Sequence, residues 1–89
     1  MRTSLRERAE ELEVNLTRGQ QREATKLAAK VYVETHARIP DKYGGEYVYN
    51  AGHAADLVII DAAICTEIVC GGTKEQQRAW TKLKEQGLV

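Results

Sequence analysis

An acidic residue stands in the middle of the most apolar stretch of the chain, "DLVIIDAAICTEIV". Wound as a helix, this stretch places Asp61 at the centre of an apolar face, with aliphatic residues one turn away on either side. A buried carboxylate without a partner is costly enough to give up its charge. We therefore expect Asp61 to be a buried polar residue that is paired with Arg6, Arg38 or a tyrosine hydroxyl. The alternative is a general acid or base, but the sequence places no second carboxylate or histidine beside it.

Four basic residues follow one another at a spacing of four, namely Arg18, Arg22, Lys26 and Lys30. On a helix this spacing aligns the four cations in one row, opposite the apolar face. Such a row can follow the phosphate backbone of a nucleic acid. Neighbouring glutamates compensate part of the charge, so a solvated helix face is the other interpretation. The four residues are candidates for nucleic-acid binding.

Three tyrosines, Tyr43, Tyr47 and Tyr49, crowd the segment "PDKYGGEYVYN" at residues 40–50. The proline and the paired glycines indicate a loop, in which "EYVY" can form at most a short edge strand. Tyrosine is enriched at protein interfaces because it offers a large, stiff contact area. We expect these tyrosines to contact a protein partner; the other interpretation is a lid that folds over the protein's own core.

The remaining chemistry-bearing residues do not form a recognisable site. His53 and Asp56 have the spacing of half a metal site, but a ligand from the preceding helix would have to complete it, and we interpret them as an exposed polar edge. Cys65 and Cys70 lie five residues apart, which neither suits a disulfide within one helix nor matches a zinc finger. Ser4, the only serine, is explained as a helix cap. The sequence predicts no catalytic residue, metal or cofactor.

Helix signals divide the chain into four helices. Three capping boxes, "SLRE" at 4–7, "TRGQ" at 17–20 and "TKEQ" at 73–76, begin the first, second and fourth helices. The apolar spacing of the first helix extends to Leu16, and Pro40 limits the second. The third helix, 51–70, follows Asn50 as its cap. We predict an all-α bundle of four helices in a single domain, residues 1–89, with one Tyr/Gly-rich loop between the second and third helices.

The third predicted helix is apolar on nearly every side, so it should be central. Alanines at positions 51, 55 and 62 share one face, on which we expect a neighbouring helix to pack closely. Ile60 falls instead on the side of His53 and Asp56. Three short partners do not cover this much apolar surface, and we therefore expect a homodimer.

The composition limits the class of partner. The chain of 89 residues carries 13 basic and 13 acidic side chains, so no whole-molecule field draws it towards nucleic acid or anionic lipid. The N-terminal segment is charged, and acidic residues interrupt the only long apolar run. We expect a cytoplasmic protein that does not contact a membrane.

The first two predicted helices carry one resemblance to a known class. The segment "RAEELEVNLTRGQQREATKLA" resembles a helix-turn-helix, in which Ala-Glu-Glu-Leu is followed by a turn, a valine and a polar helix start. This sequence has Glu13 where such turns commonly use glycine, and its second helix is longer than usual. The resemblance implies a DNA-binding segment at residues 4–38.

Two functions remain open from the sequence. The first is a small non-enzymatic α-helical interaction protein that regulates or inhibits a protein partner, in the manner of bacterial or phage accessory proteins. The alternative is a DNA-binding regulator that uses the helix-turn-helix-like segment.

Overall fold

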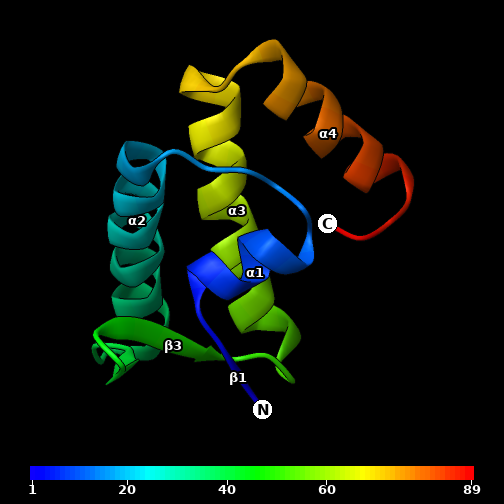
Figure 1. Cartoon of the computed structure of the whole chain (residues 1–89). Coiled ribbons are helices and arrows are strands. Elements are labelled where there is room, and N and C mark those ends of the chain that lie inside the picture. Colours follow the sequence, from blue (N-terminus) through cyan, green and yellow to red (C-terminus); the bar gives the residue numbers. More distant parts are fainter.

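The chain folds into four helices and a small three-stranded sheet (Figure 1). A computed structural model describes all residues, 1–89. The elements follow in the order β1 (Arg2–Thr3), α1 (Leu5–Glu11), α2 (Arg18–His36), β2 (Asp41–Tyr43), β3 (Glu46–Asn50), α3 (Ala54–Gly71) and α4 (Lys74–Glu85). The prediction of four helices is confirmed, but the protein is mostly helical and not all-α, because a sheet is also present.

Three helices begin where the capping boxes predicted. The side chain of Ser4 accepts a backbone hydrogen bond at the start of α1, and Thr17 and Thr73 form complete capping boxes before α2 and α4. The predicted cap of the third helix was wrong. Asn50 ends β3, and His53 occupies the N-cap of α3 without capping it by its side chain.

Helix α1 is shorter than the apolar spacing suggested, since it ends at Glu11 and leaves Leu16 in the connection to α2. The backbone turns at Glu13, whose φ is 58°, the left-handed conformation that usually belongs to glycine. The amide of Val14 then donates to the carbonyl of Ala9 at 2.9 Å and closes the helix end.

The segment predicted as a loop is a β-hairpin. Gly44 and Gly45, with φ values of 60° and 82°, form its turn. β3 is not an edge strand, because it lies between β1 and β2 and pairs antiparallel with both. Thr3 pairs with Tyr49, so the N-terminal residues complete the sheet from a distance that no local sequence pattern indicates.

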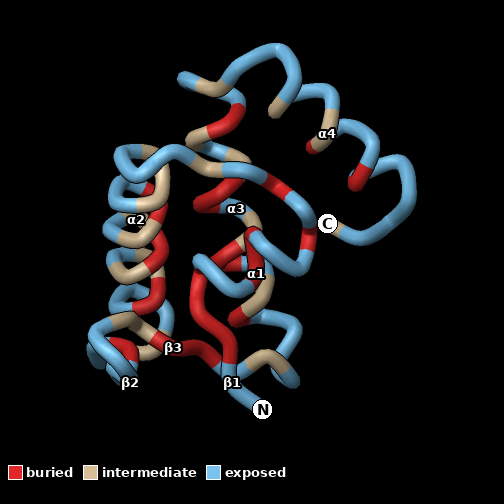
Figure 2. Tube along the Cα trace, in the orientation of Figure 1, coloured by how far each residue is buried: buried red, intermediate tan, exposed pale blue.

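Helix α3 lies at the centre, with α2 along one side, α1 across it and α4 near its C-terminal end (Figure 1). Ile60, Ile64 and Ile68 are fully buried. Figure 2 shows the buried segments of α3 in red. The predicted orientation was partly wrong, because Ile60 is in the core while Ala55 and Ala62 are exposed. Although α3 is apolar, neither it nor any other helix is both long and apolar enough to cross a membrane.

Candidate functional site

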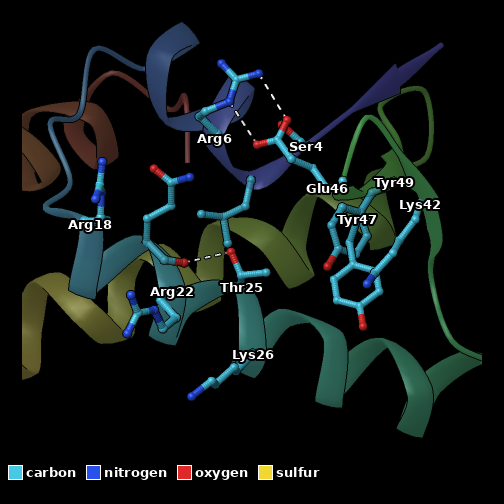
Figure 3. A pocket seen from close by; sticks show the side chains of 13 residues that line it. Ser4, Arg6, Arg18, Arg22, Thr25, Lys26, Lys42, Glu46, Tyr47 and Tyr49 are labelled. Carbon is cyan, nitrogen blue, oxygen red and sulfur yellow. Dashed lines mark hydrogen bonds and ion pairs between the residues drawn. The ribbon is translucent and has the colours of Figure 1, made fainter.

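A cleft of about 340 Å³ opens between α1, α2 and the β2–β3 hairpin. It brings together residues that lie far apart in the sequence: α2 contributes Arg18, Arg22 and Lys26, and the hairpin contributes Lys42 and Tyr47 (Figure 3). Three residues of the predicted basic row and two of the three predicted tyrosines, Tyr47 and Tyr49, therefore line one cleft. The cleft is the best candidate for a functional site in this protein.

The basic row is positioned by the way α2 begins and packs. The capping box at Thr17 starts the helix so that Arg18 is its first residue. The buried side of α2 carries Ala24 and Ala28, both 0% exposed, and this turns the basic row outwards. All four residues of the row are exposed, but Lys30, the last of them, does not line the cleft.

The three tyrosines occupy three different environments. Tyr43 is 74% exposed near the hairpin turn, whereas Tyr47 is half-buried and lines the cleft. Tyr49 is only 3% exposed and packs edge-on against Tyr32 in the core, with 5.6 Å between ring centroids. The three rings therefore do not form one continuous exposed surface.

Tyr47 and Lys42 are cross-strand partners in the hairpin. The Lys42 ammonium nitrogen lies 5.0 Å from the centroid of the Tyr47 ring, within the range of a cation–π contact. This contact holds the lysine beside the cleft without neutralising its charge. An acidic ligand in the cleft would meet both the ammonium group and the ring.

The cleft carries more positive than negative charge. Arg6 lines it too, but its guanidinium group is bound to Glu46 by two hydrogen bonds of 2.9 and 3.1 Å and to Glu10 by one of 3.0 Å. The hydrogen bonds to Glu46 are the main cause that raises the pKa of Arg6 above its ordinary value, and the hydrogen bond to Glu10 is the second cause. In contrast, Arg18 and Arg22 form no ion pair within the chain, and neither does Lys42. Three cations at the cleft are thus free to bind an anion.

Lys26 is the fifth basic residue at the cleft, and it contacts Glu23 on the same helix at 3.6 Å. Both side chains are largely exposed, so this contact contributes little and a ligand can displace it. An acidic ligand would therefore find a mainly basic surface along the first two turns of α2.

Asp61 lies outside this cleft and has a structural role. Its two carboxylate oxygens accept hydrogen bonds from the Arg8 guanidinium group, at 2.9 and 3.0 Å. The prediction of a paired carboxylate is right in kind, but the partner is Arg8 and not Arg6, Arg38 or a tyrosine. Asp61 is half-buried, with its side chain 16% exposed. The pair raises the pKa of Arg8 and ties α1 to α3.

The predicted polar edge of the third helix is also rearranged by the fold. Asp56 is buried, and its carboxylate contacts His36 Nε2 at 3.0 Å and accepts a hydrogen bond from the amide of Asn50 at 3.3 Å. His53 remains exposed. A second cavity, of about 390 Å³, lies beside the His36–Asp56 pair. The structure brings no three His, Cys, Asp or Glu side chains into a group suited to a metal ion.

The two cysteines are both free, with Cys65 half-buried and Cys70 exposed. They lie on α3, and neither lines the cleft or the cavity beside His36. They therefore take no part in the candidate site.

Sequence reasoning missed Arg6, Lys42 and Glu46. Tyr43 and Glu46 flank the Gly-Gly pair, so recognising a two-residue hairpin turn there would have placed Lys42, one position further along, opposite Tyr47. No sequence signal would have found Arg6, because its position depends on the packing of α1 against the hairpin. Comparisons with protein-family models, with curated proteins and with solved structures found no match to this chain.

Proposed function

We propose that the protein is a non-enzymatic binding protein that regulates or inhibits a protein partner, and that the partner places an acidic segment in the cleft. The observation that carries this proposal is the meeting of the α2 basic row with the hairpin, where Arg18, Arg22 and Lys42 have no ion pair of their own. Charged groups that are arranged in this way steer a complementary partner and fix its register.

The ring of Tyr47 makes partner binding at the cleft more specific than the basic residues would make it alone. It is half-buried in the cleft and held by Lys42, so a partner residue can pack on it without a large loss of side-chain entropy. Arginine and tyrosine are the residue types that most often dominate binding energy at interfaces. We propose that the protein acts in this way in the cytoplasm and as a homodimer, as the sequence suggested.

The experiment compares the proteins that wild type and three variants capture from cells. Wild type and Lys30→Glu should capture the same partner, because Lys30 lies in the basic row but outside the cleft. Arg22→Glu and Tyr47→Ala should weaken that capture about tenfold, equivalent to about 1.4 kcal/mol. Equal capture by wild type and all three variants would remove the cleft from the proposal.

A second function, duplex DNA binding by residues 4–38, is favoured by one observation. Glu13 adopts the left-handed conformation that glycine usually supplies in the turn of a helix-turn-helix, and the start of α2 presents exposed Arg18 and Arg22. A duplex contacted by these residues should bind with a salt slope of about 0.9 per phosphate contact.

The hairpin distinguishes the two functions. Tyr47→Ala should leave DNA affinity unchanged, because the helix-turn-helix-like segment does not include the hairpin, but it should weaken binding of an acidic protein segment. Fluorescence anisotropy with a labelled DNA duplex, at several salt concentrations, measures the first of these effects. If no salt-dependent binding of the duplex is observed, the second function is eliminated.

A further inference from the structure

The outward face of α3 differs from every other helix surface of the protein. All the exposed residues of this helix are uncharged. They are Ala54, Ala55, Val58, Ala62, Thr66, Val69, Cys70 and Gly71. The exposed faces of α2 and α4 are mostly charged, as is normal for a helix side that meets water. Val58 and Val69 are 65% and 63% exposed, so the apolar groups on α3 are open to solvent in the single chain.

These residues follow the spacing of a helix–helix contact. Ala55, Val58, Ala62, Cys65 and Val69 are separated by three, four, three and four positions, which is the pattern of a seam between two helices. The fully buried Ile64 lies on the opposite side of α3, facing the protein's own core. Within the chain only Cys65 is partly covered, because it packs against the core, and the other four residues of the seam are exposed.

The accessible surface area of the chain is larger than that expected for a compact monomer, as it would be if a partner normally covered part of it. Its accessible surface is 5906 Å² for a mass of 10.0 kDa. A compact monomer of that mass is expected to expose about 5,200 Å², so this chain exposes about 700 Å² more. A standard interface covers about 800 Å² of each partner. The excess is close to what one protomer buries in a stable dimer.

We infer that a second copy of this chain covers the outward face of α3, with the two α3 helices antiparallel around a twofold axis at Ala62. In this arrangement Ala55 of each protomer packs against the partner's Val69, and Val58 against the partner's Thr66. The small alanines at positions 55 and 62 let the two helix axes approach closely. An uncharged face that is complementary to itself needs no other protein to cover it.

The dimer leaves the cleft open, because none of the residues that line the cleft belongs to α3. The inference rests on the homodimer of the proposed function and names its interface, whereas ligand binding at the cleft can hold or fail independently of the dimer. Binding of an acidic ligand should survive in a monomeric variant.

Sedimentation equilibrium tests the dimer. Wild type should have twice the 10.0 kDa chain mass in the micromolar range, and Val58→Glu should have the mass of one chain. Val33→Glu is the matched control, since Val33 is an exposed valine on α2, and it should remain dimeric. Circular dichroism should show unchanged helix content in both variants. A monomeric wild type, or Val58→Glu that sediments as wild type does, would overturn the inference.

Cysteine crosslinking tests the orientation, in a background with Cys65→Ser and Cys70→Ser. Ala62→Cys should form a disulfide-linked dimer under mild oxidation, because position 62 meets itself on the twofold axis. Ala55→Cys should not, because antiparallel packing places it against position 69 of the other chain. Crosslinking at both positions would show parallel helices, and crosslinking at neither would exclude α3 as the interface; each result overturns the arrangement.

Discussion

The ion pair between Arg8 and Asp61 should contribute strongly to stability. The two side chains are only 11% and 16% exposed and share two hydrogen bonds of 2.9 and 3.0 Å. Asp61→Ala leaves the Arg8 guanidinium group with the carbonyl of Leu88 at 3.2 Å and the carboxylate of Glu11 at 3.0 Å. Breaking a buried pair typically costs about 3 to 5 kcal/mol, and the remaining acceptors and partial exposure lower our expectation to about 2 to 3 kcal/mol.

Urea unfolding measures this loss, because Trp80 is the only tryptophan, is 4% exposed and reports on the core by its fluorescence. The same loss should lower the melting temperature by roughly 8 to 24 °C in a domain of this size. Asp61→Asn should be less destabilising, since its amide oxygen still accepts one hydrogen bond from Arg8.

A double-mutant cycle separates the interaction free energy of the Arg8–Asp61 pair from the other effects of the two substitutions. Arg8→Met combined with Asp61→Ala should destabilise by clearly less than the sum of the two single changes, because no charged group is then left unpaired. If Asp61→Ala lies within about 0.5 kcal/mol of wild type, or if the two changes are additive, the pair does not hold α1 to α3 as described.

Two further predictions concern the backbone and the core. Glu13→Gly should raise the free energy of unfolding by about 0.5 to 1 kcal/mol, because glycine adopts the φ of 58° without strain, and an unchanged or lower urea midpoint would contradict this. Burial of its side chain is the main cause that raises the pKa of Tyr49 from 10.0 to about 12, and the neighbouring Tyr47 is the second cause. The folded state therefore keeps a proton that the unfolded state loses, so stability should fall as pH rises from 10 to 12. Tyr49→Phe should reduce that fall, and urea midpoints with the same pH dependence in both proteins would refute the assignment.

Features set by local sequence were predictable. The capping boxes at Thr17 and Thr73 are satisfied within four residues, so the starts of α2 and α4 follow from the sequence alone. The alignment of Arg18, Arg22 and Lys26 depends only on helix geometry. The pairing of Asp61 follows from the cost of burying a carboxylate, but the identity of Arg8 does not, because it depends on where α1 packs.

Features set by contacts between distant segments were not predictable. The sheet gains its third strand, β1, from residues 2–3. These residues pair with residues 49–50 of β3, which lie far away along the chain. Without that strand, "EYVY" has too few neighbours to be recognised as the centre of a sheet. The face of α3 was misjudged for a related reason, since a helix that is apolar all round does not reveal which side its neighbours cover. The cleft exists only where α1, α2 and the hairpin meet.

A titration of the ¹⁵N-labelled protein with a glutamate-rich peptide, followed by amide chemical shifts, tests the proposed function most directly. The shifts should change along the start of α2, from Arg18 to Lys26, and in the hairpin at Lys42 and Tyr47. Arg22→Glu should need about tenfold more peptide to give the same changes, Lys30→Glu should preserve them, and a lysine-rich peptide should produce none. Shift changes confined to other surfaces, or the absence of any change with the acidic peptide, would contradict the assignment of the cleft as the binding site.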